Sequence, residues 1–89
     1  MHKASSFGDV SIAKLIVKRN NGLINAIDND DKTSLHLACE QGHLDMVRFL
    51  VKGCYAKVNI KEQNDQTAWD LAKMNGHEDI VTFFAKIRR

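Results

Sequence analysis

Apolar and polar positions follow one another along the chain in short blocks whose spacing predicts paired helices. Segment 33–41 has apolar residues at helical spacing, with Thr33 placed to cap its first turn and Gly42 to end it. Segment 44–52 is apolar around most of a helix circumference, at Leu44, Met46, Val47, Phe49, Leu50 and Val51. We expect this second helix to be sandwiched between neighbouring elements.

The helix pairs are separated by segments of a different composition. Segments 23–32 and 55–66 hold β-tolerant residues followed by Asn, Asp, Gln and Lys. Such a composition is typical of a turn that projects into water. Each unit therefore consists of two short helices and an extended loop, and it cannot bury both of its faces alone.

The same arrangement recurs at a step of 34 residues, which separates Gly8 from Gly42 and Gly42 from Gly76. The step also links three alanines and three lysines, which are Ala4, Ala38 and Ala72, and Lys18, Lys52 and Lys86. Three residue types in one register indicate a tandem array.

Residues 33–47, with the sequence TSLHLACEQGHLDMV, resemble the ankyrin-repeat motif, in which T-P-L-H-x-A precedes a Gly-His pair and a valine-bearing second helix. Ile24-Asn25 and Val58-Asn59 are similar to the hydrophobic-asparagine step between repeats of this family. The resemblance implies an all-α helix–turn–helix solenoid with β-turn loops, containing about two and a half to three repeats. We expect one domain over 1–89, made of a partial repeat (1–26), a central repeat (27–60) and a capping repeat (61–89).

The chain departs from the family pattern at three places. The family period is about 33 residues, so we expect the extra residue to widen a loop near 19–22 and 52–56. Ser34 and Ala68 stand where a proline usually begins the first helix, which should loosen its initiation slightly. Asp31 and Asp65 replace the turn glycine, and aspartate tolerates the left-handed conformation at modest cost.

The two ends of the array are expected to differ. The last repeat reads TAWDLA from Thr67, which is similar to closing repeats of the family, and polar residues are available for an exposed end face at Glu78, Asp79, Thr82, Lys86, Arg88 and Arg89. At the other end Met1 aligns with Leu35, so the first helix lacks its initiating turn. The chain is therefore either a brief N-terminal cap or a fragment of a longer array.

Composition narrows the function classes. The apolar fraction of 44% and the charged fraction of 27% are those of a folded soluble domain. A net charge of +2 with basic residues clustered only at the C-terminus argues against nucleic acid as a partner. No apolar run approaches the length of a membrane span, and two cysteines are too few for a secreted scaffold. We expect an intracellular protein with reduced Cys39 and Cys54.

The histidines, the cysteines and the single tryptophan are the candidates for chemistry. His36, Cys39 and His43 have a spacing that could begin a zinc site, but Gly42 interrupts the helix and the family uses both histidines structurally. We therefore expect no metal, no cofactor and no enzyme activity. Trp69 aligns with Leu35, which predicts a core position rather than an exposed binding anchor.

The resemblance places partner recognition on the turn tips and on the concave face of the first helices. By register the turn-tip candidates are Asn29, Asp30, Lys32, Gln63, Asn64 and Gln66. The concave-face candidates are Ser6, Phe7, Glu40, Gln41, Met74 and Asn75. We expect a non-catalytic module that binds a protein or peptide. The alternative is a structural fragment that stacks on further repeats or, through an open N-terminal face, on a second copy, although a monomer is favoured.

Overall fold

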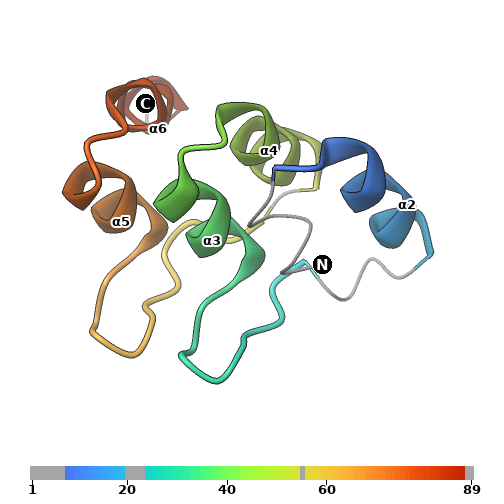
Figure 1. The fold of residues 1–89 in the computed structure, drawn as a ribbon, viewed down its shortest axis with the longest axis horizontal. Helices are drawn as coiled ribbons and strands as arrows, with labels where there is room; N and C mark the ends of the chain where they lie inside the picture. The colour runs from blue at the N-terminus through green and yellow to red at the C-terminus, as the bar shows by residue number, and fades with distance from the viewer. Residues whose placement is uncertain (1–7, 20–23, 55, 88–89) are drawn as a thin grey trace.

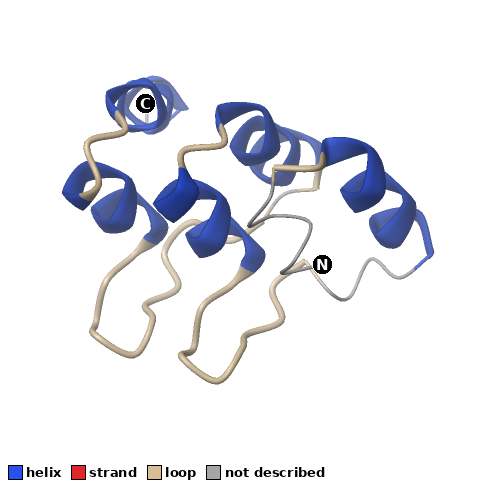
Figure 2. Ribbon diagram, viewed as in Figure 1, coloured by secondary structure: helices blue, strands red, loops and turns tan. Residues whose placement is uncertain are grey.

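The computed structural model describes residues 8–19, 24–54 and 56–87. Its elements are α2 (Val10–Arg19), α3 (Ser34–Gln41), α4 (Leu44–Arg48), the π-helical segment η2 (Phe49–Gly53), α5 (Ala68–Met74) and α6 (Glu78–Ile87). Over the described ranges all regular elements are helical and none is a strand, which confirms the predicted all-α class (Figure 2).

The helices form two rows, as Figure 1 shows. Helices α3 and α5 lie side by side in one row, and α2, α4 and α6 form a second row, which lies above the first in this view. The two long loops extend away from both rows and lie next to each other. The first helix of each pair thus carries the loop, and the second helix lies on the far side.

Each first helix begins at a threonine that satisfies its open backbone donors. The Thr33 hydroxyl accepts a hydrogen bond from the His36 amide, and the His36 ring accepts one from the Thr33 amide, which completes a capping box. Thr67 and Asp70 form the same box at α5. Gly42 ends α3 in the left-handed conformation, with φ of 79°. The predicted cap and end of this helix are confirmed.

The predicted second helix, Leu44 to Lys52, is helical throughout but changes type at its end. From Phe49 to Gly53 it becomes a π-helix, and the Cys54 amide donates to the Phe49 carbonyl at 3.1 Å. A π-turn holds one residue more than an α-turn. The end of this helix therefore holds one residue more than an α-helical turn, just before and within the segment 52–56 where a wider loop was expected. The corresponding positions 20–22 lie outside the described residues.

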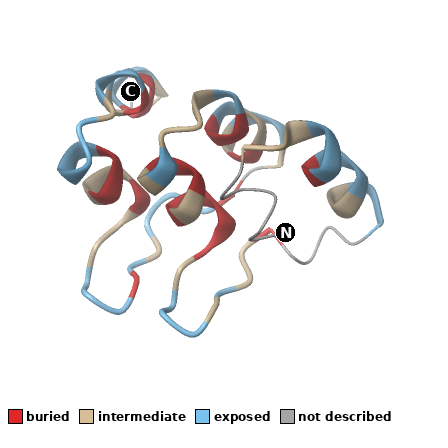
Figure 3. Ribbon diagram, viewed as in Figure 1, coloured by how far each residue is buried: buried red, intermediate tan, exposed pale blue. Residues whose placement is uncertain are grey.

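The core lies between the two rows of helices (Figure 3). Helix α4 contributes Met46 and Val47, η2 contributes Leu50, and α6 contributes Ile80 and Phe84, all fully or almost fully buried. Helix α4 is packed between its neighbours, as its all-round apolar pattern predicts.

Glycine and histidine also interlock successive units. A Cβ atom at Gly42 would lie 2.6 Å from the His77 ring, and one at Gly8 would lie 2.6 Å from the His43 ring. The His77 Nε2 atom lies 3.0 Å from the Glu40 carbonyl oxygen, within hydrogen-bonding distance. Glycine is required at both positions for two reasons. The backbone has a positive φ angle there, and the histidine ring of the following repeat lies against it.

Candidate functional site

The predicted turn tips lie on two compact turns, which we call the finger turns (Asp28–Lys32 and Glu62–Gln66). In each turn the first and last residues are joined by a backbone hydrogen bond, from the Asp28 amide to the Lys32 carbonyl and from the Glu62 amide to the Gln66 carbonyl. The predicted left-handed aspartates are confirmed, since Asp31 has φ of 59° and Asp65 has φ of 63°. The finger turns are therefore regular in spite of their lack of glycine.

A carboxylate at the start of each finger turn organises its backbone. Asp28 Oδ1 accepts hydrogen bonds from the amides of Asp30 and Lys32, both at 2.9 Å. Glu62 Oε1 accepts from the amides of Asn64 at 2.7 Å and Gln66 at 3.1 Å. Glu62 is only 5% exposed, so it is a structural residue of the turn, although its polar surroundings predict a solvated side chain. The 34-residue register, which aligns it with Asp28, is the signal that could have revealed this role.

The two finger turns are tied to each other and to the helices. The Gln63 amide donates to the Asp30 carbonyl at 2.9 Å, which joins the tips. His36 bonds Thr33 through Nδ1, and its Nε2 lies 3.2 Å from the Gln66 carbonyl of the next unit. This confirms the expected structural role of His36 within and between repeats. Burial lowers the pKa of its imidazole.

The base of each finger turn also contacts the C-terminal end of the following helix. Lys32 Nζ lies 2.8 Å from Glu40 Oε2, and this hydrogen-bonded ion pair raises the pKa of Lys32. One repeat later, Gln66 Nε2 donates to Met74 Sδ at 3.4 Å. The same register position therefore carries an ion pair in one repeat and a weak neutral contact in the next.

The structure places the sequence-predicted residues as follows. It leaves most of them exposed, namely Asn29, Asp30, Gln41, Gln63, Asn64, Met74 and Asn75. Lys32, Glu40 and Gln66 are half-buried. The amide of Asn75 donates back to the Leu71 carbonyl of its own helix, at 2.8 Å, so it is directed away from a partner. Ser6 and Phe7 lie outside the described residues.

The finger surface is acidic. Segments 28–32 and 61–66 contain five carboxylates and two lysines. Lys32 forms an ion pair with Glu40. Lys61 and Asp65 form a solvent-exposed ion pair, in which Nζ lies 3.6 Å from Oδ1. Asp30 and Asp31 are exposed at the tip of the first turn. The surface therefore presents a negative field to an approaching partner.

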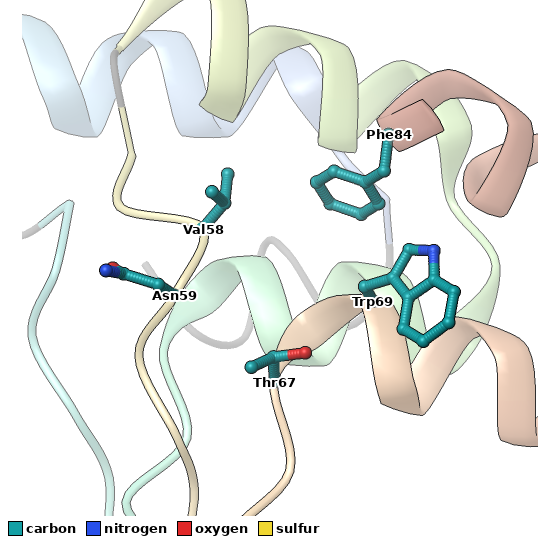
Figure 4. Close-up of a pocket in the computed structure, with 5 residues that line it drawn as sticks. All are labelled: Val58, Asn59, Thr67, Trp69 and Phe84. Carbon is teal, nitrogen blue, oxygen red and sulfur yellow. The ribbon is translucent and has the colours of Figure 1, made fainter. Parts of the chain in front are cut away.

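A small apolar pocket, absent from the sequence prediction, lies at the C-terminal end of the stack (Figure 4). It has a volume of about 140 Å³ and is lined by Val58, Asn59, Thr67, Trp69 and Phe84. Trp69 packs against the core on one side, as predicted, but it is only half-buried because its other side borders this pocket. The Lys73 ammonium group lies 4.9 Å from the centre of its ring.

Neither cysteine has the surroundings of a reactive thiol. Cys39 is buried and Cys54 is half-buried, and burial raises the pKa of both. Within the described ranges, no three or more His, Cys, Asp or Glu side chains gather as ligands for a metal ion. Both nitrogens of His36 lie within hydrogen-bonding distance of protein groups.

The paired helices, capped by threonine and stacked by glycine and histidine, agree with the sequence comparison. The sequence model of ankyrin repeats, in three copies, matches residues 1–88. The chain belongs to the ankyrin-repeat family. No curated protein sequence matches it.

Membership defines the general function of the chain. Ankyrin-repeat domains are generally protein-binding modules and are typically non-catalytic. Among the described residues, no helix has the length and apolar character needed to cross a membrane.

Proposed function

We propose that this ankyrin-repeat chain binds a partner protein or peptide, without catalysis, through its two finger turns and the adjoining concave ends of α3 and α5. The observation that supports this most directly is the rigid coupling of the fingers. The Gln63–Asp30 backbone bond joins the tips, and the Lys32–Glu40 pair joins a finger to its helix. A preformed surface loses little conformational entropy on binding.

The charge of the finger surface indicates the chemistry of the partner. Asp30 and Asp31 are exposed carboxylates, whereas Lys32 and Lys61 are each paired within the chain. A partner segment rich in Lys or Arg would complement this surface and accelerate encounter at low salt. Uncharged hydrogen-bonding groups lie beside the carboxylates, on the exposed amides of Asn29, Gln63 and Asn64.

Selection from a random peptide library against the immobilised chain tests this proposal. We expect the selected peptides to be enriched in basic residues and to bind more weakly in high salt. The combined variant Asn29→Ala, Asp30→Ala, Gln63→Ala, Asn64→Ala should lose binding. A matched control, Arg48→Ala with Thr82→Ala, changes exposed residues of the far row of helices and should bind normally. Peptides that bind the finger variant and the control equally would disprove the finger proposal.

Stacking on another repeat or on a second copy is a second candidate function, favoured by one register comparison. Ile12 is 48% exposed on α2, whereas Met46 and Ile80, at the same position of the two later repeats, are fully buried. Leu15 is likewise 62% exposed, while its equivalent Phe83 is 8% exposed. These positions pack against the preceding repeat where one is present.

Sedimentation of the chain over a range of concentrations tests self-stacking. If the exposed face pairs two copies, dimers should form and Ile12→Glu or Leu15→Glu should abolish them. Ser11→Glu adds the same charge at an exposed polar position of α2 and serves as the control. A monomer at every concentration would count against self-stacking and leave the finger proposal unaffected.

A further inference from the structure

One imidazole joins the bases of the two finger turns. It belongs to His36, which is only 1% exposed. Its Nδ1 atom accepts a hydrogen bond at 3.0 Å from the amide of Thr33, the residue that follows the first finger turn. Its Nε2 atom lies 3.2 Å from the carbonyl oxygen of Gln66, the last residue of the second finger turn. The two turns are therefore connected through a side chain that can gain a proton.

The two contacts fix the tautomer of His36. A backbone amide only donates, so Nδ1 carries no hydrogen when it accepts from Thr33. The hydrogen of the neutral ring is then on Nε2, which donates it to the Gln66 carbonyl. A further proton is therefore added at Nδ1. The Thr33 hydroxyl, 2.8 Å from Nδ1, can accept this proton, but the buried Thr33 amide is left without an acceptor.

The next repeat has the same cap without an imidazole. There Asp70 Oδ2 accepts from both the amide and the hydroxyl of Thr67, each at 3.0 Å. A carboxylate keeps its acceptor oxygens at the mildly acidic pH at which an imidazole gains a proton. Of these two caps, only that of α3 therefore changes between neutral and mildly acidic pH.

The surroundings of the ring set the direction in which its pKa moves. Burial disfavours the imidazolium most strongly, two backbone carbonyls and Glu62 of the second finger turn favour it, and Lys32 of the first disfavours it. Glu40 on α3 is bonded to Lys32, and Asp70 on α5 is bonded within its own cap. The pKa of His36 is lowered on balance. His36 thus contributes stability that is complete above its ordinary pKa of about 6.5 and is lost as the pH falls through the lower pKa of the folded chain.

We propose that His36 is an acid-sensitive joint of the finger surface, whose protonation frees the Thr33 amide, loosens the base of the first finger turn and weakens binding of a basic partner. Only the last of these steps rests on the proposed function, because the loosening needs no partner. Protonation also places a positive charge beside an acidic surface. This charge opposes a segment rich in Lys or Arg, so both effects weaken binding.

Nuclear magnetic resonance of the nitrogen-labelled chain tests the joint without a partner. The ring nitrogens of His36 should show the Nε2–H tautomer at about pH 7.5 and should titrate at a pKa below about 6.5. After correction for the intrinsic exchange rate, the Thr33 amide should be about tenfold less protected at about pH 5 than at about pH 7.5. The Thr67 amide, which is bonded to Asp70, is the internal control and should keep its protection.

Protein variants assign the effect to one ring. His36→Asn keeps an acceptor oxygen for the Thr33 amide but does not titrate, so it should remove the change in protection. His36→Asp, which copies the cap of α5, should do the same and replaces the asparagine variant if that variant folds poorly. His43→Asn and His77→Asn each remove a different imidazole and should leave the change in place.

Binding is measured with a rhodamine-labelled peptide of alternating Lys and Ser, which does not titrate between these pH values. The parent chain should bind it about five- to tenfold more weakly at about pH 5 than at about pH 7.5, and His36→Asn should bind it equally at both. A peptide that binds at neither pH would overturn the finger proposal and the binding step, whereas hydrogen exchange still decides the joint. The joint is disproved by an imidazole that stays neutral at about pH 5, by unchanged protection of the Thr33 amide, or by an equal change in His36→Asn.

Discussion

Helices α2 and α6 occupy equivalent positions at opposite ends of the stack, but their outward faces differ (Figure 1). The outward face of α2 carries Ile12 and Leu15, which are aliphatic and exposed. The outward face of α6 instead carries exposed polar residues, among them Glu78 and Lys86. Among the described residues, the outward face of α2 is therefore more apolar than that of α6.

The register shows how this difference arises. Val10 and Leu44 are half-buried apolar residues at one position of their helices, and the last repeat has the exposed Glu78 there. At another position of the same helices, the half-buried Val17 and Val51 of the first two repeats correspond to the exposed Ala85 of the last repeat. The positions that face the preceding repeat stay apolar in all three repeats. A residue's burial thus depends on whether its repeat has a neighbour, as well as on its type.

The largest difference in the free energy of unfolding is expected between substitutions of a buried residue and of its exposed equivalent in the first repeat. Met46→Ala removes a fully buried side chain and should lower the free energy of unfolding by about 2–5 kcal/mol. Ile12→Ala, at the same register position in α2, should change it by less than about 0.5 kcal/mol, because the side chain is half exposed. Urea denaturation followed by circular dichroism measures both. Equal losses would mean that α2 is covered in solution.

A second comparison concerns the two glycines that follow α3 and α5. Gly42→Ala places a Cβ atom against the His77 ring and also strains a positive φ, so we expect a loss of about 2–4 kcal/mol. At Gly76 no atom of the described residues lies within 4 Å of the position that a Cβ would take, although φ is also positive. Gly76→Ala should therefore cost about 1–2 kcal/mol from backbone strain alone. Thermal unfolding of both variants separates the contact with His77 from the backbone strain. Equal shifts of the unfolding temperature would argue against a contribution from that contact.

A third comparison tests the position where the family usually has proline. The Ser34 hydroxyl is buried without a hydrogen-bond partner among the described residues, whereas Ala68 has no such group. Ser34 is the first residue of α3, and Thr33 before it is extended, so proline fits there. Ser34→Pro should raise the free energy of unfolding by about 1–2 kcal/mol, and Ala68→Pro by about 0.4–1 kcal/mol. Denaturant titration measures the difference, and a larger gain at Ala68 would contradict the role of the buried hydroxyl.

Much of the fold could be predicted because its determinants are local and repeated. Thr33, His36 and Gly42 fix the start and end of α3 through contacts within a few residues, and the 34-residue step carries the pattern to the next repeat. The left-handed aspartates follow from the same alignment. These features depend on short-range backbone chemistry, which the sequence displays directly.

Features that depend on neighbours in space were harder to predict. The π-turn at Phe49–Gly53 reflects where the packed helix can accept an extra residue, and a single sequence does not show this. Glu62 was expected in water, but it is buried beneath its own turn. The pocket beside Trp69 is formed by residues from the interrepeat loop, α5 and α6, which lie far apart in the sequence, so no local pattern indicates it.

The smallest expected difference in the free energy of unfolding is between substitutions of the two asparagines in the interrepeat loops. Asn25 accepts the Lys57 amide across the repeat boundary, so Asn25→Ala should lower the free energy of unfolding by about 0.5–1.5 kcal/mol. Asn59 has no such bond among the described residues, and Asn59→Ala should leave stability unchanged within about 0.5 kcal/mol. Hydrogen exchange at the Lys57 amide gives an independent measure, since it should quicken in Asn25→Ala only. Because each variant removes the same amide group, any loss of stability specific to Asn25 is due to the segment packed beside it. An equal loss at Asn59 would contradict this difference between the two asparagines.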